Sequence, residues 1–348
     1  MKVLITGSCG LIGSEAVRHY DKRADIVVGI DNNLRAEFFG TDGDTTWMQS
    51  KLKAECPKYK HRSIDIRDRE TIAKIVEELR PDLLIHCAAQ PSHDWAARNP
   101  IVDFEVNALG TLNLLEATRQ FVPEAVFIFM STNKVYGDAP NRIQLKEMSS
   151  RWEYDEPRFI NGISESFSVD QSLHSLFGAS KVAADIMVQE YGRYFDMKTV
   201  ALRGGCLTGP SHSGAELHGF LSYFFKAAKN GKQYTIYGYK GKQVRDQIHS
   251  ADVINVFEEI YKNPKCGAVY NLGGGKDNSV SILESIDRVE QLLEKKINYV
   301  YSDQNRVGDH ICYYSDLTKL KSDYPCWSQT YSIDDIFEEF ARGHYSTD

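Results

Sequence analysis

Three glycines near the N-terminus have the spacing of a loop that binds a diphosphate. Gly7, Gly10 and Gly13 follow an apolar run at 2–6 and precede a helical pattern of apolar residues. Gly7 allows a sharp turn, Gly10 lets the backbone approach a pyrophosphate at a helix N-terminus, and Gly13 allows the helix to pack closely on the strand. We expect this loop to bind a dinucleotide, with further contacts from Cys9, Leu11 and Ile12.

An acidic residue follows at the distance that a nucleoside-binding carboxylate requires. The apolar run 25–30 ends at Asp31, eighteen residues after Gly13. A carboxylate there accepts hydrogen bonds from both ribose hydroxyls of an adenosine and repels a 2′-phosphate, so NAD is favoured over NADP. The alternative is a structural turn in a different kind of α/β protein. The residues expected around the adenosine are Asp31, Asn32, Asn33, Arg35, Asp65 and Ile66.

Asp65 has two interpretations of equal weight. As the end of a strand at 62–66 it could accept a hydrogen bond from the exocyclic amine of adenine. As a residue just before a helix at 69–79 it could instead cap that helix.

The elements that position these residues alternate between strand and helix. Apolar runs predict strands at 2–6, 25–30, 62–66, 83–86, 126–130, 198–202 and 268–272. Helical spacing predicts helices at 47–54, 69–79, 107–119 and 173–195, and the polar stretch 139–172 reads as a long active-site loop. Strict alternation predicts a parallel sheet with right-handed crossovers.

The predicted fold class is therefore α/β, a Rossmann doubly wound parallel sheet with a smaller C-terminal α/β lobe that binds the substrate. We place the Rossmann domain at 1–203, with 241–272 returning to it. The substrate lobe takes 204–240 and 273–348. Small residues at the end of strand 83–86 would let a cofactor lie against the backbone, and the expected contacts are Ala88, Ala89, Gln90 and, from the next helix, Asn107.

Composition excludes several classes of function. The 348 residues carry a net charge of −7 without a basic run, so we expect no nucleic-acid partner. Seven scattered cysteines without CxxC pairs indicate neither a disulfide framework nor a metal site. No apolar run has the length of a membrane span and no signal sequence is apparent, so we expect a cytoplasmic protein without a membrane partner.

Two further motifs resemble those of the extended short-chain dehydrogenase/reductase family. The segment Ser131-Thr132-Asn133-Lys134-Val135-Tyr136-Gly137 is similar to the family's hydroxyl-bearing motif, and Lys181 lies where the family has the lysine of YxxxK. The resemblance implies that Thr132 bonds the reacting oxygen and that Lys181 binds the nicotinamide ribose. The family's tyrosine is replaced here by Phe177, which has no proton to exchange.

A missing acid/base lowers a rate by about 10²–10⁴ without impairing ligand binding. The side chains that could substitute for it are Tyr136, His93, His174 and His212.

Within that family the chain resembles the CDP-tyvelose (CDP-paratose) 2-epimerases. The resemblance rests on the segments 132–138, 170–171, 178–185 and 241–246, with His249. The family's 4,6-dehydratases carry Asp-Glu directly after the threonine. An amide and an ammonium, at Asn133 and Lys134, cannot perform that pair of proton transfers, so dehydration is not expected.

The same resemblance implies a nucleotide-sugar site. Arg245 and Arg306 lie where the family places guanidinium groups on the diphosphate, although either could instead be a surface arginine in an ion pair. The substrate-binding residues implied are Ser92, His93, Thr132, Asn133, Lys134, Gly205, His218, Arg245, Arg306 and Asp309.

The leading hypothesis is an NAD-dependent epimerase of a nucleotide sugar, with a CDP-sugar favoured. Transient oxidation at C2 and return of the hydride to the opposite face would regenerate NAD, so no net redox occurs. The alternatives are a dehydrogenase or reductase with net NAD turnover, and an NAD-binding homologue impaired by Phe177. The resemblance also implies a homodimer.

Overall fold

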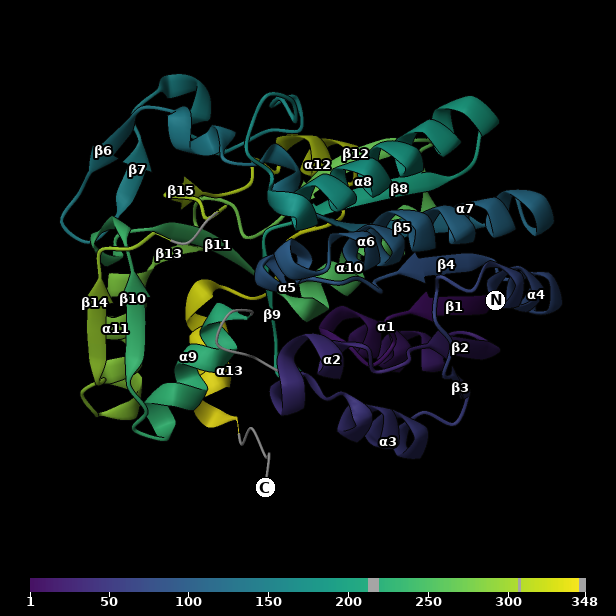
Figure 1. Cartoon of the computed structure of the whole chain (residues 1–348), viewed down its shortest axis with the longest axis horizontal. Coiled ribbons are helices and arrows are strands. Elements are labelled where there is room, and N and C mark those ends of the chain that lie inside the picture. Colours follow the sequence, from purple (N-terminus) through teal and green to yellow (C-terminus); the bar gives the residue numbers. More distant parts are fainter. Residues whose placement is uncertain (212–218, 306–307, 344–348) are drawn as a thin grey trace. The chain divides into compact units, whose positions relative to one another are not determined.

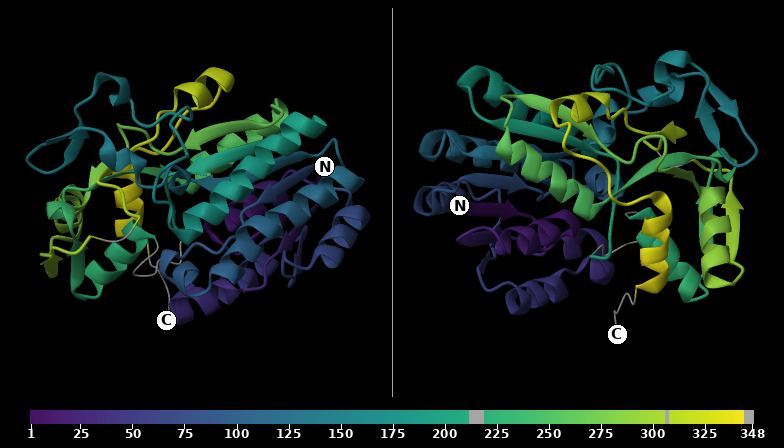
Figure 2. Two further views of the ribbon diagram at one scale, coloured as in Figure 1. Left: turned by 45° about the horizontal axis from the view of Figure 1, so that its top comes forward. Right: turned by 180° about the vertical axis from the view of Figure 1, so that it is seen from behind.

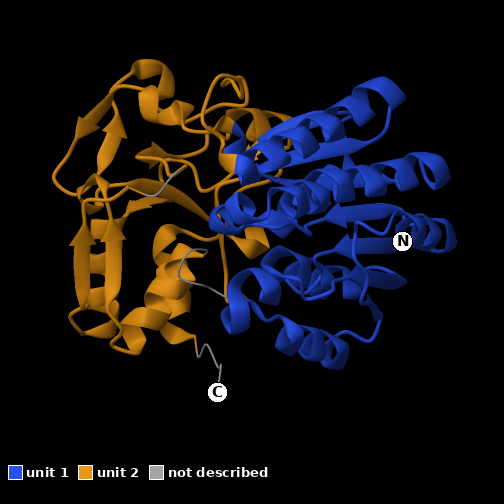
Figure 3. Cartoon of the chain, viewed as in Figure 1, with its two compact units in different colours: residues 1–135, 176–203, 253–270 blue, residues 136–175, 204–252, 271–348 orange. Residues whose placement is uncertain are grey.

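The chain divides into two compact units. The computed structural model describes residues 1–211, 219–305 and 308–343 (Figure 1). Unit 1 comprises 1–135, 176–203 and 253–270, and unit 2 comprises 136–175, 204–252 and 271–348 (Figure 3). The boundaries differ from the predicted domains in three segments, because 136–175, 241–252 and 271–272 belong to unit 2.

The core of unit 1 is a seven-stranded sheet in the order β12-β8-β5-β4-β1-β2-β3. Pairs β1–β2, β1–β4, β2–β3 and β4–β5 are parallel, as the β/α alternation predicted. Near-continuous apolar runs form the central strands because helices cover both faces of a parallel sheet. The strands are β1 (Lys2–Thr6), β2 (Ile26–Ile30), β3 (Tyr59–Arg62), β4 (Leu83–His86), β5 (Val126–Thr132), β8 (Thr199–Gly204) and β12 (Ala268–Leu272).

Helices cover both faces of this sheet. Those labelled α1, α3 and α10 lie on one face and α4, α7 and α8 on the other (Figures 1 and 2). In the described part of the chain, no helix is long and apolar enough to span a membrane. The helices are α1 (Leu11–Asp21), α2 (Arg35–Phe39), η1 (Gly40–Gly43), α3 (Thr46–Glu55), α4 (Arg69–Leu79), α5 (His93–Arg98), α6 (Pro100–Phe104), the π-helical η2 (Glu105–Leu109), α7 (Gly110–Phe121), α8 (Ser175–Phe195) and α10 (Ser250–Lys262).

The strand predicted at 62–66 was wrong, because β3 spans Tyr59–Arg62. Tyr59 pairs with Val27 and is buried, so the strand begins three residues before the predicted start at Arg62. The residues after Arg62 form the connection to α4.

Unit 2 is built from smaller pieces. Strand β11 is central to a four-stranded sheet, pairing with β9, β13 and β15. Helices α9, α11 and α13 share an apolar core that includes Phe224, Ile286 and Phe337. The stretch predicted as the loop 139–172 contains the hairpin β6–β7. The elements are η3 (Asn133–Tyr136), which begins in unit 1, η4 (Ala139–Arg142), β6 (Leu145–Glu147), β7 (Trp152–Tyr154), η5 (Pro157–Phe159), β9 (Cys206–Thr208), α9 (Phe220–Lys229), β10 (Tyr234–Tyr237), η6 (Tyr239–Gly241), β11 (Val244–His249), β13 (Ser279–Ser281), α11 (Ile282–Leu293), β14 (Tyr299–Ser302), β15 (Cys312–Tyr313), α12 (Thr318–Asp323) and α13 (Ile333–Arg342).

Candidate functional site

The glycine loop between β1 and α1 is closed by contacts that leave no room for side chains at two positions. Gly7 has a φ of +66°, and a Cβ added there would lie 2.7 Å from the Ala88 nitrogen. A Cβ at Gly13 would lie 2.0 Å from the Gly7 carbonyl oxygen. At Gly10 the nearest atom to such a Cβ is 3.4 Å away, so this part of the loop stays accessible to a ligand.

The N-terminus of α1 is suited to an anion. Its N-cap residue, Gly10, makes no side-chain cap hydrogen bond, and the first turn contains no acidic residue. The first N–H groups of a helix lack intrahelical acceptors, and the helix dipole favours negative charge at this end. The loop and helix therefore fit the pyrophosphate of a dinucleotide.

Asp31 is held in place at the end of β2 by two backbone groups. Its Oδ2 accepts a hydrogen bond from the Cys9 amide at 2.9 Å, and its Oδ1 accepts one from the Asn33 amide at 2.9 Å. The carboxylate is half-buried and keeps further lone pairs for ribose hydroxyls. Burial lowers the pKa of the neighbouring Arg35 guanidinium to about 10, although Asp31 acts in the opposite direction.

The segment after Asp31 is tied to a second loop by an asparagine. Asn33 has a φ of +58°, and its Oδ1 accepts hydrogen bonds from the Thr45 amide and hydroxyl at 2.9 and 3.0 Å. Its Nδ2 donates to Asp44 at 3.0 Å. These bonds account for the ordered path of the insertion at 32–45 that follows the second strand.

Asp65 does not cap α4, so that interpretation was wrong. The helix cap is Asp68, whose side chain accepts a hydrogen bond from the Thr71 amide. Asp65 instead receives Arg67 Nη2 at 2.7 Å and Asn32 Nδ2 at 3.2 Å. Burial acts to raise the pKa of Asp65, but the Arg67 bonds hold it below its usual value, so the carboxylate remains a charged acceptor.

The Ile66 side chain contributes packing, and its backbone carbonyl accepts a hydrogen bond from Asn113 Nδ2 at 3.1 Å. It is buried in the main apolar cluster of unit 1, and its side chain lies against Gly110, the first residue of α7.

The end of β4 is joined to α8 by a buried polar network. The Gln90 amide donates to Asn107 Oδ1 at 2.9 Å, and Gln90 Nε2 donates to Asp103 Oδ1 at 2.6 Å. Asn107, on the π-helical segment η2, donates through Nδ2 to Ser180 Oγ at 3.0 Å. The network fixes Gln90, the residue that directly follows Ala88 and Ala89, which were predicted to contact the cofactor.

Sequence reasoning predicted Gln90 and Asn107 as cofactor ligands and missed their partners Asp103 and Ser180. Asp103 is buried and therefore requires hydrogen-bonding partners, but its burial is a tertiary property that no local spacing indicated.

Thr132 lies at the end of β5 and Lys181 in the second turn of α8. The Thr132 hydroxyl accepts a hydrogen bond from the Lys134 amide at 3.2 Å. Lys181 Nζ donates to the Met130 carbonyl at 2.8 Å and lies 4.1 Å from the centre of the Phe129 ring. Burial lowers the pKa of Lys181 to about 8 although Asp185 opposes that shift. The ammonium therefore lies beside the strand that ends in the predicted catalytic hydroxyl.

Phe177 occupies the position of the family's tyrosine. It lies one turn before Lys181 on α8 and is buried. The His93 ring contacts it edge to face, with ring centroids 4.9 Å apart. Two residues that were predicted from separate motifs, one for the substrate and one for catalysis, are therefore neighbours in unit 1.

Sequence reasoning missed a second buried group next to these residues. Ser131 Oγ donates to Asp185 Oδ2 at 2.5 Å, and Arg203 Nη2 donates to Asp185 Oδ1 at 2.8 Å. This buried ion pair connects β5, α8 and β8 directly beside Thr132 and Lys181. The partners are far apart in sequence, so no local spacing indicated the pair.

In unit 2, Arg245 donates to Asp309, and its Nη1 also donates to the Val244 carbonyl at 2.7 Å. These two predicted substrate residues thus contact each other. Gly205 lies against the carboxylate of the buried Asp246. The predictions for His218 and Arg306 lie outside the described residues.

Two further predicted substrate residues follow Thr132 at the start of η3. Asn133 is buried and Lys134 is half-buried. Ser92 caps α5, because its hydroxyl accepts a hydrogen bond from the Trp95 amide at 3.2 Å.

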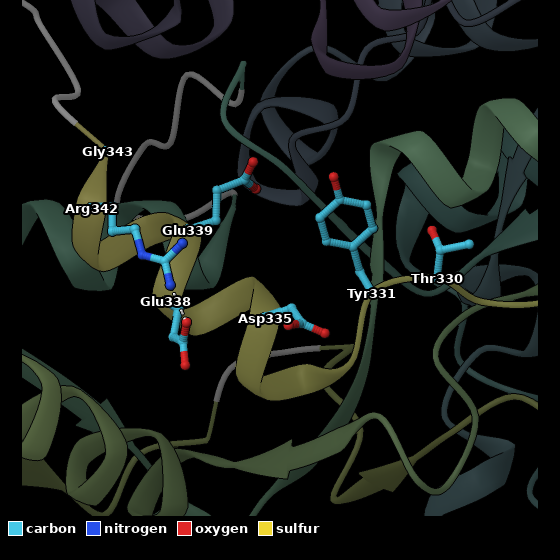
Figure 4. Close-up of a pocket in the computed structure, with 7 residues that line it drawn as sticks. All are labelled: Thr330, Tyr331, Asp335, Glu338, Glu339, Arg342 and Gly343. Carbon is cyan, nitrogen blue, oxygen red and sulfur yellow. Dashed lines mark hydrogen bonds and ion pairs between the residues drawn. The ribbon is translucent and has the colours of Figure 1, made fainter.

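A pocket of about 520 Å³ lies along α13 and contains none of the predicted site residues (Figure 4). Its walls include the ion pair between Arg342 and Glu338. Its lining residues are Thr330, Tyr331, Asp335, Glu338, Glu339, Arg342 and Gly343.

Comparison with known proteins decides the family. Residues 3–273 match the model of the NAD dependent epimerase/dehydratase family. The chain belongs to this family. The predicted resemblance, the Rossmann fold, the NAD cofactor and the nature of the protein as an enzyme of this kind are thereby confirmed.

Individual members of the epimerase/dehydratase family show how far the similarity extends. CDP-paratose 2-epimerase from Salmonella typhi is 34% identical over 96% of this chain and 96% of its own length. A dTDP-glucose 4,6-dehydratase from Salmonella typhimurium is 29% identical over 86% of this chain and 80% of its own. The structure of UDP-glucuronic acid 4-epimerase from Bacillus cereus, in complex with UDP-glucuronic acid and NAD, superposes with a TM-score of 0.79 at 24% identity, covering 98% of each chain.

Proposed function

We propose that this protein is an NAD-dependent epimerase that inverts C2 of a CDP-activated sugar. The observation that carries the proposal is the similarity to a CDP-paratose 2-epimerase, which extends over 96% of both chains and therefore includes both units. The residues that follow the catalytic threonine add to it, because Asn133 and Lys134 cannot replace the acid and base of a dehydratase.

The cofactor is held by the glycine loop and Asp31. The N-terminus of α1 receives the pyrophosphate and the Asp31 carboxylate receives the adenosine ribose, which leaves no place for a 2′-phosphate. When bound, the nicotinamide would take up a hydrogen with its electron pair from the sugar and give it back.

The protein side chains act on the sugar oxygen and on the ribose. In this proposal Thr132 hydrogen-bonds the oxygen attached to the reacting carbon, and Lys181 would hold the nicotinamide ribose when NAD is bound. Burial lowers the pKa of the Lys181 ammonium to about 8. Inversion requires the keto sugar to turn over before the hydrogen returns.

The nucleotide is bound by unit 2. Arg245 can donate two parallel hydrogen bonds to a phosphate, and in the absence of one Asp309 accepts from it. The Asp309 carboxylate raises the pKa of Arg245 despite the opposing effect of burial, so the guanidinium is charged. A phosphate that displaces Asp309 would meet a cation that is already positioned.

The alternative of an NAD-binding homologue that has lost catalysis rests on Phe177 alone, because the ring at this position cannot exchange a proton. The relatives, which are named as an epimerase and a dehydratase, do not favour it. A dehydrogenase with net NAD turnover is not favoured by any residue of the described site.

The proposal is tested with purified protein. Denaturation of the purified protein should release NAD, which mass spectrometry identifies. Without added NAD, the native protein should convert CDP-paratose to its C2 epimer, CDP-tyvelose. The inversion is followed by proton NMR of the sugar ring. Release of NAD without turnover of any CDP-, UDP- or GDP-sugar would favour the impaired homologue, and a requirement for stoichiometric NAD would favour the dehydrogenase.

We also propose that the protein forms a homodimer through α6, η2 and α8. Large apolar side chains are exposed on these elements, namely Ile101, Phe104, Leu109, Leu176 and Ile186, with Ile101 exposed by 73%. In Figure 1 these helices lie on the same face of the unit 1 sheet. Exposed apolar patches of this kind mark protein–protein contacts.

The dimer is tested by light scattering after gel filtration. Ile101→Glu should yield monomers, whereas Ile160→Glu, at another exposed isoleucine, which lies in unit 2, should leave the dimer intact. A wild-type monomer at micromolar concentration would refute the dimer.

A cytoplasmic location stays a prediction. All seven cysteines lie in the described part of the chain, and none forms a disulfide there. Thiols of this kind are typical of a reducing compartment. Fractionation of cells that express the native gene would test it.

A further inference from the structure

The structure places an imidazole next to the position where the family's proton donor is missing. The rings of His93 and Phe177 meet edge to face at a centroid distance of 4.9 Å and an interplanar angle of 65°. Phe177 is buried, whereas His93 is half-buried and so remains accessible to a ligand.

The other side chains considered as substitutes are occupied elsewhere. Tyr136 is fully buried in unit 2 and donates its hydroxyl to Asn271 Oδ1 at 2.7 Å. His174 also belongs to unit 2, where its Nδ1 lies 2.9 Å from the Ser172 carbonyl. His212 lies outside the described residues. The ring contact described for Phe177 comes from His93.

The backbone of His93 is held by its neighbours. The Ser92 amide donates to Gln90 Oε1 at 2.5 Å, and the Ser92 hydroxyl caps the helix that begins with His93. Gln90 is in turn bound to Asp103 and Asn107. Trp95, two residues further on, is buried and its ring centroid lies 4.7 Å from that of Phe38. The imidazole therefore projects from a rigid segment, as positioned proton transfer requires.

We propose that His93 is the acid/base of the reaction, in place of the phenol that is absent at position 177. The inference rests on the proposed epimerase function and names the residue that moves the proton. An imidazole is suited to this role because its ordinary pKa, about 6.5, allows it to accept and return a proton near neutral pH.

The proton and electron balance is complete within the site. The O–H bond at sugar C2 breaks and its proton moves to an imidazole nitrogen of His93. A bound NAD would take up the hydrogen and the electron pair of the C2–H bond. Carbon C2 is oxidised to a ketone. After the sugar turns, the hydrogen and electron pair return to the opposite face of C2, and the imidazolium gives its proton back to the oxygen.

The decisive experiment combines two substitutions in the full-length protein with bound NAD. His93→Gln should lower kcat by about 10²–10⁴ with little change in KM or in the affinity for the CDP-sugar measured by calorimetry. The double variant His93→Gln with Phe177→Tyr should regain much of the lost kcat, because a phenol then stands beside Lys181. His19→Gln, at a half-buried histidine of α1 that pairs with Glu258, serves as the matched control and should keep the wild-type kcat.

Two outcomes overturn the inference while leaving the epimerase function intact. One is a His93→Gln variant with the wild-type kcat. The other is a double variant no faster than His93→Gln alone. Failure of the wild-type protein to epimerise any nucleotide sugar would instead refute the proposed function itself.

A readout independent of turnover accompanies the kinetics. Diethyl pyrocarbonate modifies neutral imidazoles, and peptide mass spectrometry locates the modified residue. His93 should react in the ligand-free protein and be protected when NAD and the CDP-sugar are bound together. Equal modification with and without ligands would place His93 away from the sugar and refute the inference.

Discussion

The residues assigned to the cofactor and those assigned to the nucleotide sugar differ in how the chain brings them together. In unit 1 the glycine loop and Asp31 lie within one β-α-β segment, and the Cys9 amide joins them directly. In unit 2 Arg245 meets Asp309 across 64 positions of sequence. The residues proposed to bind the cofactor are close in sequence, so their spacing predicts the site. The residues proposed to bind the nucleotide sugar come from distant segments, so only the resemblance to a known family predicted them. The following predictions test whether the two units also divide the ligands between them.

The largest effect is expected at the buried ammonium of unit 1. Burial lowers the pKa of Lys181 from 10.5 to about 8. The charged form is thus disfavoured in the folded state, and this penalty is fully present below pH 8 and disappears as the pH rises above 10.5. Lys181→Met should raise the free energy of unfolding of the NAD-free protein at pH 7 by up to about 3 kcal/mol. Turnover should fall by about 10²–10⁴.

Urea denaturation at several pH values measures the difference in stability. It should shrink as the pH rises from 8 towards 10.5. Lys74→Met, at an exposed position of α4, is the control and should change neither quantity appreciably. A Lys181→Met protein that is less stable than wild type at pH 7 would contradict the account of the site.

The next effect concerns the adenosine. Asp31→Asn removes the charge and turns a donor towards the backbone amides of Cys9 or Asn33. Hydrogen bonds to charged groups contribute about 1.5–3 kcal/mol, so NAD affinity should fall by about 10- to 100-fold, and the preference over NADP should narrow. Calorimetric titration with both dinucleotides measures this, and Asp25→Asn, exposed in unit 1, is the control. A parallel loss of CDP affinity would break the proposed division of ligands.

A smaller effect is expected in unit 2. Arg245→Lys keeps the charge but loses the planar fork, so the affinity for CDP should fall by about tenfold while NAD affinity is retained. The control is Arg142→Lys, whose guanidinium is exposed and paired with Asp138 in the same unit. The outcome that counts against the assignment is unchanged CDP binding in Arg245→Lys.

The smallest effect tests stability without ligands. Ser281 caps α11 in a capping box with Glu284, and Ser281→Ala should lower the free energy of unfolding by about 1 kcal/mol. NAD affinity should not change, because the cap lies in unit 2. Ser50→Ala, on the exposed side of α3, should be neutral. Loss of NAD binding in Ser281→Ala would show that the units are not independent.

Much of unit 1 was predictable because its elements have strong local signals. The predicted ranges 69–79, 83–86 and 268–272 agree with α4, β4 and β12 to the residue. Strand β3 was misplaced because it reads Tyr-Lys-His-Arg, and only its pairing with β2 makes it a strand. Hairpin β6–β7 was missed for the same reason, since its polar residues are ordered by cross-strand partners.

The candidate site was predicted less completely than the fold. Spacing indicated Asp31 and Lys181, but the buried partners that support the site, Asp103 and Asp185, are defined only by tertiary contacts. The contact between His93 and Phe177 likewise could not be derived from sequence, because the two residues are 84 positions apart and lie on different helices. Local spacing carries no information about which helix ends meet.

The hydrogen bond between Cys9 and Asp31 has a kinetic consequence. It joins the glycine loop to the end of β2, so the groups proposed to bind the pyrophosphate and the adenosine ribose are held together by a bond within the protein. Little chain freedom is then lost on association, and escape requires breaking several contacts at once. Slow dissociation of NAD suits an epimerase, because each turnover regenerates NAD and the enzyme can reuse the same molecule.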